Sequence, residues 1–288
     1  MNRHILDPEV QDYINSHLSA DVHQLALSKS PFKGVTVAEL ANQIRAKNKA
    51  AKKLPSWYTA EGIFYPPVLS IEQTSSETTA KYKSTLAIGS HLLDLTGGFG
   101  VDSFYFARKV ETVTHCEINA ELSQVATHNA GILQQHNITF HSGDGLEYLH
   151  NHKSNFDTIY VDPARRSNAG KVFMLKDCTP DITAHLDFLL SKARRVIIKT
   201  APLLDITAGL KELFNVSEVH IVSVKNECKE LLWIIDGNLP ADHSVKIVAV
   251  TLNETLKQFS FDKEEAEVTA VLAEADRKNT CMNPTLLY

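Results

Sequence analysis

The sequence predicts an α/β protein in which a largely parallel sheet carries helices on both faces. Three observations lead to this prediction. Short apolar segments alternate with helical patterns from about residue 91 to residue 200. Gly97, Gly98 and Gly100 follow the first of these segments directly, as expected of a tight turn from a strand into a helix. The last two strands are separated only by the short polar turn VKNECKE, which favours an antiparallel pair.

The chain before the sheet is predicted to be helical. Apolar residues recur at three- and four-residue spacing up to about residue 70, which predicts an N-terminal helical cap. The proline-containing segments LPSWY and FYPPVL end this part. Thr74 with Glu77 three residues later fits a capping box, so a further helix is expected to begin there and to run to about residue 86.

Seven strands are expected in the sheet, at residues 92–95, 112–117, 138–142, 158–162, 195–200, 218–224 and 230–236. Beyond them, two strands at 244–252 and 258–261 and a helix at 263–277 are expected to form a small C-terminal ββα extension. These patterns divide the chain into a helical cap (1–70), a ligand-binding domain (71–239) and the extension (240–288).

The composition narrows the class of protein. The 288 residues carry a net charge of −5, which gives no global electrostatic reason to expect nucleic-acid binding. The four cysteines are scattered without a Cys-x-x-Cys spacing, so we expect a reducing, cytoplasmic location and no metal site. No apolar stretch of about 18 residues and no signal peptide is visible, so no membrane association is expected.

One segment is locally basic. Arg45 and four lysines crowd into RAKNKAAKKLPSWY, with Trp57 and Tyr58 directly behind them. A basic stripe beside aromatic rings can contact RNA phosphates and bases. A solvated helix face followed by a Trp that anchors the core explains the same residues.

Acidic residues stand at the ends of the first four strands. Ligands of open parallel sheets bind outside these carboxyl ends. Glu117 suits the two hydroxyls of a ribose, and Asp144 suits an adenine amino group. The loop after Asp94 lacks the third glycine of the dinucleotide fingerprint, which favours S-adenosylmethionine over a nicotinamide cofactor. Taken singly, Asp94 and Asp144 are equally well explained as ordinary turn residues.

The motifs DLTGGFG, CEINAEL, GDG and YVDPARR, in this order, resemble those of class I S-adenosylmethionine-dependent methyltransferases, which have a Rossmann-like sheet. EQTSSETTAKYK, DPARR and NECKELL resemble the motifs of one bacterial group, which has a ferredoxin-like segment and a THUMP-like C-terminal region. The resemblance covers almost the whole chain. In two places the sequence departs from the usual motifs: Thr96 replaces the first glycine of the loop, and Ala164 and Arg165 replace the second proline and the aromatic residue of D-P-P-Y.

The resemblance and the strand-end positions together predict the site residues. Expected at the cofactor are Gln73, Ser75, Ser76, Asp94, Thr96, Gly97, Gly98, Phe99, Gly100, Asp102, Glu117, Ile118, Asp144 and Gly145. Asp162 and Pro163 are the expected catalytic residues, and Arg165, Arg166 and Lys199 the expected substrate-binding residues. Helix capping, core packing and salt bridges remain open as alternatives for the serines, Phe99 and the arginines.

The predicted function is S-adenosylmethionine-dependent methylation of a base nitrogen in structured RNA. The resemblance implies tRNA or rRNA as the partner and guanine N2 as a candidate atom. Two alternatives stay open on the same architecture: a nicotinamide-dependent oxidoreductase, and an RNA-binding protein without catalytic activity.

Overall fold

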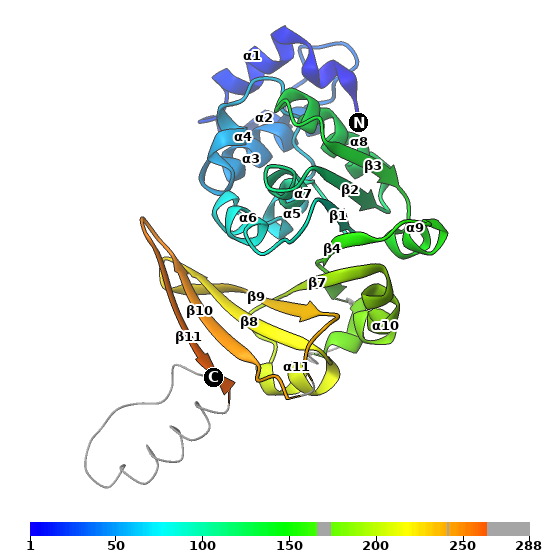
Figure 1. Ribbon diagram of the computed structural model, residues 1–288. Coiled ribbons are helices and arrows are strands. Elements are labelled where there is room, and N and C mark those ends of the chain that lie inside the picture. The colour runs from blue at the N-terminus through cyan, green and yellow to red at the C-terminus, as the bar shows by residue number, and fades with distance from the viewer. Residues whose placement is uncertain (166–173, 241, 264–288) are drawn as a thin grey trace, which may run out of the picture. The chain divides into compact units, whose positions relative to one another are not determined.

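The computed structural model describes residues 1–165, 174–240 and 242–263, and the chain divides into two compact units, residues 1–153 and 154–288. The first unit contains the N-terminal helices and three strands. Among its described residues, the second unit contains the remaining strands and the helices that lie between residues 175 and 212 (Figure 1). The predicted division at residues 70 and 239 stays a prediction.

The first 84 residues of the first unit are mainly helical. The longest helix begins with a capping box, in which Glu39 N donates to Thr36 Oγ1 at 3.2 Å and Thr36 N donates to Glu39 Oε2 at 2.8 Å. The elements are η1 (Arg3–Leu6), α1 (Pro8–Ser16), α2 (Val22–Ala26), α3 (Val37–Lys53), α4 (Pro55–Thr59), α5 (Val68–Gln73) and α6 (Glu77–Ser84).

Trp57 joins these helices to the rest of the first unit. Its side chain is buried, and its ring lies 5.0 Å from the ring of Phe99 and 5.5 Å from that of Phe104, in α7 (Val101–Phe106). Ile14 and Leu40 belong to the same hydrophobic cluster. The cap is therefore held by apolar burial, and Trp57 is a core residue rather than a surface ring for base stacking.

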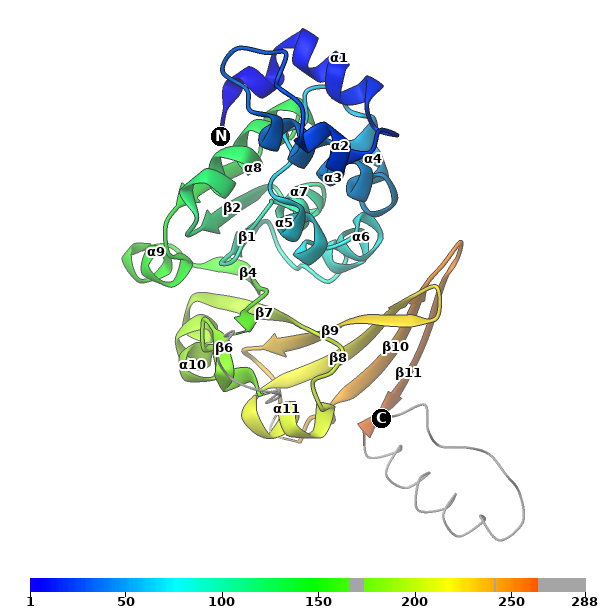
Figure 2. The same cartoon turned by 180° about the vertical axis from the view of Figure 1, so that it is seen from behind.

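Three parallel strands form the sheet of the first unit, in the order β1-β2-β3 (Figure 1). Figure 2 shows β1 and β2 from behind. They are β1 (His91–Asp94), β2 (Thr112–Glu117) and β3 (Ile138–Ser142), and β2 and β3 are followed by α8 (Ala120–Ile132) and α9 (Gly145–Asn151). Asp94 lies opposite His115, and Glu117 lies opposite Ser142. The three carboxyl ends therefore meet at one edge, as the sequence predicts.

The second unit has a mixed arrangement of six strands in the order β4-β7-β9-β8-β10-β11. β4 and β7 are parallel, and β9 is antiparallel to both β7 and β8. The elements are β4 (Phe156–Val161), β5 (Ala164–Arg165), η2 (Leu175–Asp177), β6 (Cys178–Thr179), α10 (Ile182–Lys192), β7 (Ala193–Thr200), α11 (Ile206–Glu212), β8 (Val216–Val224), β9 (Glu227–Asp236), β10 (Lys246–Leu252) and β11 (Leu256–Asp262).

The expected number of seven strands is wrong. In the part of the chain that the structure describes, three strands in the first unit and six in the second make nine, besides the short β5–β6 pair. The additional two are β10 and β11: β10 pairs in parallel with β8, and β11 pairs with β10. The antiparallel β8–β9 pair is confirmed, but β10 covers the edge of β8. An uncovered strand edge offers unpaired N–H and C=O groups, which explains why the extension continues the strand order. The predicted helix at 263–277 lies almost wholly outside the described residues.

We expect Trp57→Ala to lower the free energy of unfolding by about 3–5 kcal/mol, because it removes a large buried ring from the core. Tyr58→Ala, at the partly exposed neighbouring position, is the matched control and is expected to cost less. Urea denaturation measures both. Equal effects of the two substitutions would contradict the anchoring role of Trp57.

Candidate active site

Asp94 ties together the two ends of the glycine loop, which we define as residues 95–100. Its carboxylate is buried: Oδ1 accepts a hydrogen bond from Thr96 N at 3.1 Å, and Oδ2 accepts one from the Ser103 hydroxyl at 2.5 Å. Ser103 lies in the first turn of α7. One carboxylate therefore fixes both the start of the loop and the start of the helix that follows.

The shape of the glycine loop requires its glycines. Gly98 and Gly100 have φ angles of +55° and +87°, in the left-handed region that side chains disfavour. A larger residue does not fit at position 97, because a Cβ there would lie 2.2 Å from Cδ2 of His115. The loop backbone consequently approaches β2 more closely than any other residue would allow.

His115 supports the glycine loop from β2, and the sequence analysis did not predict this role. The ring is buried, and Nε2 lies 3.3 Å from the carbonyl oxygen of Gly98, so Nε2 carries the hydrogen and donates it. Burial is the main cause that lowers the pKa of His115 to about 4. The imidazole is therefore neutral at physiological pH and acts as a packing group.

Glu117 connects the glycine loop to the start of α8. Its Oε2 accepts a hydrogen bond from Gly98 N at 2.9 Å, and its Oε1 accepts one from Asn119 N at 2.7 Å. A carboxylate has about four acceptor positions, so Glu117 can also accept hydrogen bonds from ligand hydroxyls. The next side chain, Ile118, is 74% exposed and offers an apolar surface beside this carboxylate.

The turn after β3 packs on the end of β1. Asp144 is the N-cap of α9, and its Oδ1 accepts hydrogen bonds from Leu146 N at 2.8 Å and Glu147 N at 3.0 Å. A Cβ on Gly145 would lie 2.5 Å from the carbonyl oxygen of Leu95. Glycine is needed here because the two backbones touch.

The turns after β1, β2 and β3 therefore form one cluster. Gly143 N donates to the main-chain oxygen of Glu117 at 3.0 Å, which completes the contacts among the three turns. The pKa of the Cys116 thiol is raised to about 12. Burial is the largest cause, and the negative charges of Asp94 and Asp144 add to it. Three of the four predicted acidic strand ends thus lie together in the first unit.

The segment before β1 is capped differently from the prediction. Ser76, not Thr74, is the N-cap of α6, and its hydroxyl accepts a hydrogen bond from Thr79 N at 3.1 Å. Thr74 is instead the C-cap of α5, a short helix that the sequence pattern did not reveal. The Glu77 carboxylate accepts hydrogen bonds from the N–H and hydroxyl of Ser56, so it is not available for a capping box.

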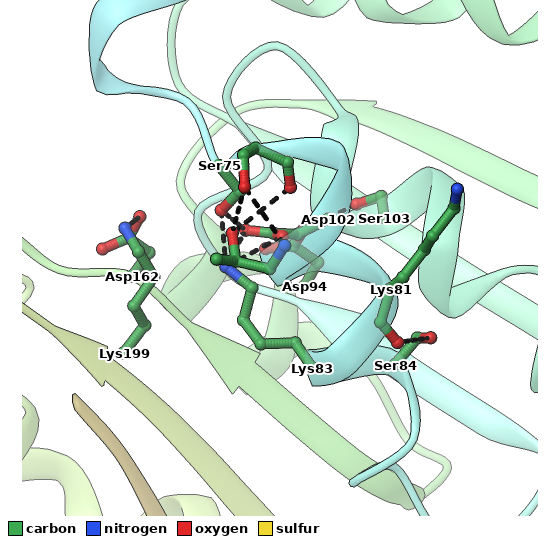
Figure 3. Close-up of polar contacts among 11 residues, drawn as sticks. Ser75, Lys81, Lys83, Ser84, Asp94, Asp102, Ser103, Asp162 and Lys199 are labelled. Carbon is green, nitrogen blue, oxygen red and sulfur yellow. Dashed lines mark hydrogen bonds and ion pairs between the residues drawn. The ribbon is translucent and has the colours of Figure 1, made fainter. Parts of the chain in front are cut away.

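Ser75 and Asp102 meet at a buried lysine, Lys83, which the sequence analysis missed. Figure 3 shows the three side chains converging from α6, α7 and the segment before α6. Lys83 Nζ donates to Ser75 Oγ at 2.5 Å and lies 3.0 Å from Asp102 Oδ1, and Ser75 Oγ donates to Asp102 Oδ2 at 2.7 Å. Two predicted cofactor residues are therefore brought together, whereas Gln73 is exposed at the end of α5.

Asp162 and Lys199 form an ion pair in the second unit. Lys199 Nζ donates to Asp162 Oδ2 at 2.5 Å, as drawn in Figure 3. The pairing of Val161 with Ile198 places both residues at adjoining ends of the parallel strands β4 and β7. Lys199, predicted to bind substrate, thus contacts the predicted catalytic carboxylate.

The structure describes only part of the DPARR motif that begins at Asp162. Pro163 is buried. Arg165 pairs through its backbone with Cys178 in the short β5–β6 sheet. Arg166 lies outside the described residues.

Much of the basic segment is engaged within the protein. Lys47 Nζ donates to Asn15 Oδ1 at 2.7 Å, and Lys49 pairs with the Glu72 carboxylate at 2.7 Å. Lys53 donates to the main-chain oxygen of Glu72 at 2.6 Å. These contacts favour the structural explanation for three of the five cationic side chains.

Within the described ranges, no helix is both long and apolar enough to cross a bilayer. The same part of the chain brings no three His, Cys, Asp or Glu side chains together as metal ligands.

Several known proteins resemble this chain, among them one from Porphyromonas gingivalis and one from Mycoplasma mobile. A candidate methyltransferase from Porphyromonas gingivalis W83, solved by crystallography, is 30% identical with a TM-score of 0.79, and the match covers 92% of this chain and 67% of that one. An uncharacterized RNA methyltransferase of Mycoplasma mobile is 37% identical over 79 residues, which are 27% of this chain and 22% of that protein. The chain thus matches a minor part of the Mycoplasma protein. No family model matches the sequence.

We expect Gly97→Ala to destabilise the protein by about 1–3 kcal/mol, because the new Cβ would overlap the His115 ring. Gly131→Ala is the matched control, since no atom lies within 4 Å of a Cβ at this helical glycine. It is expected to stabilise α8 by about 0.5–1 kcal/mol. Thermal unfolding measures both changes, and a Gly97→Ala protein as stable as the wild type would disprove the close approach.

Proposed function

Because this chain belongs to the methyltransferase family of the Porphyromonas gingivalis protein, we propose that it is an S-adenosylmethionine-dependent enzyme that methylates RNA. The observation that carries the proposal is the cluster of three turns after β1, β2 and β3. A glycine loop, a half-buried carboxylate and an exposed apolar side chain adjoin one another there. This is the set of groups that an adenosine with a charged substituent needs.

The residues of the first unit fit this cofactor. Glu117 would hold the ribose hydroxyls, Ile118 would pack on the adenine ring, and Asp144 would accept from the adenine amino group. The glycine loop would face the remainder of the cofactor with main-chain N–H groups. Ser75 and Asp102 would lie at its amino-acid end. Asp94 is buried and would act through the loop, whose conformation it fixes.

The proposed acceptor is a base nitrogen, with guanine N2 as the candidate. The cofactor supplies a methyl group already activated by a sulfonium. The Asp162 carboxylate and the main-chain carbonyl of Pro163 would accept hydrogen bonds from the amine and orient its lone pair for attack. When bound, the cofactor would supply the methyl carbon to the amine lone pair and would keep the S–C electron pair on its sulfur, and the proton lost by the nitrogen would pass to water. Arg165 and Arg166 are proposed to contact the base or a phosphate.

RNA as the substrate class is supported by the Mycoplasma mobile protein, which carries an RNA methyltransferase name. We propose a tRNA or an rRNA. The experiment that tests the function incubates the protein with tritiated S-adenosylmethionine and total RNA from a strain lacking the gene. A labelled N-methylated nucleoside is expected, whereas cofactor binding with no labelled RNA would favour a binding protein without catalytic activity.

We expect Glu117→Ala to raise the Kd for S-adenosylhomocysteine at least about 10-fold, because hydrogen bonds to a charged acceptor are lost. Glu111→Ala is the matched control, because Glu111 directly precedes the first residue of β2 and Glu117 is the last. This substitution should leave the Kd unchanged. Calorimetry measures both, and NADH should not bind the wild type. An unaltered Kd in Glu117→Ala would remove this residue from the ribose site.

We expect Asp162→Ala to reduce methyl transfer about 100-fold or more while leaving the Kd for S-adenosylhomocysteine nearly unchanged. Asp157→Ala is the control, since Asp157 pairs with Arg194 at 2.8 Å near the opposite end of β4. Its transfer rate should match that of the wild type. Activity of Asp162→Ala within a few-fold of wild type would refute the proposed acceptor site.

A further inference from the structure

The NECKELL motif contains a buried carboxylate that the proposed function does not yet use. Lys225 and Asn226, with φ angles of +52° and +62°, form the tight turn between β8 and β9. Cys228 and Lys229 are exposed, yet the next residue, Glu230, is only 3% exposed. A buried carboxylate is unfavourable unless hydrogen bonds or a positive charge compensate it.

Strand register places Glu230 on the same face as Lys199. Lys199 lies opposite Leu232 in the antiparallel β7–β9 pair. Glu230 is two residues before Leu232, so its side chain leaves the strand on the same side. The two positions are diagonal neighbours, at about 7–8 Å, within reach of long side chains.

A β-bulge in the β8–β9 pair lies directly beside Glu230. Val222 is opposite Glu230, but Ser223 is opposite Cys228, so Lys229 is the extra residue. A bulge of this kind re-aims the side chains beside it. An ion pair of Arg195 with Asp236 and a hydrogen bond between His220 and Glu218 also lie on this face.

We infer that Lys199 is a positioning residue for Asp162 and that Glu230 holds the Lys199 ammonium from the other side. This inference rests on the proposed acceptor role of Asp162. With Lys199 bonded to Oδ2, the rotation of the Asp162 carboxylate is restricted, and so is the direction of Oδ1. An acceptor amine held by Oδ1 and the Pro163 carbonyl would be aligned by this plane, and misplacement by about 1 Å can cost 100-fold in rate.

The test measures methyl transfer to the total RNA of a strain lacking the gene, titrated to saturation. Lys199→Met should lower kcat about 100-fold with an unchanged Kd for S-adenosylhomocysteine. Lys199→Arg should recover most of the rate, and Glu230→Gln should lose about 10-fold. Arg195→Met is the matched control, because Arg195 pairs with Asp236 across the same two strands and should keep its kcat.

Two outcomes would overturn the inference. If Lys199 binds an RNA phosphate instead, Lys199→Met would raise the KM for RNA, weaken its salt dependence and leave kcat unchanged. If Glu230 acts independently of Lys199, the losses of the single variants would multiply in the double variant. We expect instead that the double variant is no slower than Lys199→Met alone.

Unfolding free energies test the same coupling without RNA. Lys199→Met removes the positive charge that compensates the buried Glu230 carboxylate. Adding Glu230→Gln should therefore restore part of the stability that Lys199→Met loses. Strictly additive losses would contradict the coupling. An unlabelled RNA pool with the wild-type enzyme would contradict the proposed function, while the unfolding measurements would still decide whether the two side chains interact.

Discussion

The buried carboxylate of Asp94 is the constraint on which the rest of the candidate site depends. It accepts hydrogen bonds from the N–H of Thr96, two residues after Asp94, and from the hydroxyl of Ser103 in the first turn of α7, so the intervening backbone has little freedom. His115 then fills the space below the loop, where only glycine fits at position 97. The Glu117 carboxylate is held through the N–H of Gly98. A ligand would therefore meet a backbone already in its binding conformation, which lowers the entropic cost of binding.

One lysine in each unit is held by a carboxylate near the residues of the proposed site. Lys83 lies against Asp102 and Ser75, and Lys199 lies against Asp162. Removal of these charges from water offsets most of their attraction, so such pairs contribute little net stability. What they do contribute is direction, because a side chain bonded at its end occupies one rotamer. Their value in a methyl-transfer site is geometric, since the sulfonium needs alignment of the acceptor more than it needs proton transfer.

The sequence predicted the acidic strand ends because strand position follows from local pattern. Asp94 and Glu117 end their strands and Asp144 lies two residues beyond β3, and parallel strands bring such ends together. Lys83 was not predicted, because a lysine in a helix is ordinarily solvated. The only indication was that Lys83 lies three residues after Ala80, which is buried, so both side chains lie on the same face of α6. The pairing of β10 with β8 was also missed, because periodicity identifies a strand and not its partner.

Electrostatics restrict how RNA would be recognised. The chain carries a net charge of −5, and Lys47, Lys49 and Lys53 are bonded within the protein. Long-range attraction to a polyanion is therefore weak, and binding must depend on a small number of local contacts. Recognition of that kind selects for shape and for exposed bases rather than for charge density. This agrees with a site in which the carboxylate of Asp162, itself repelled by phosphate, is neutralised by Lys199 before a nucleotide approaches.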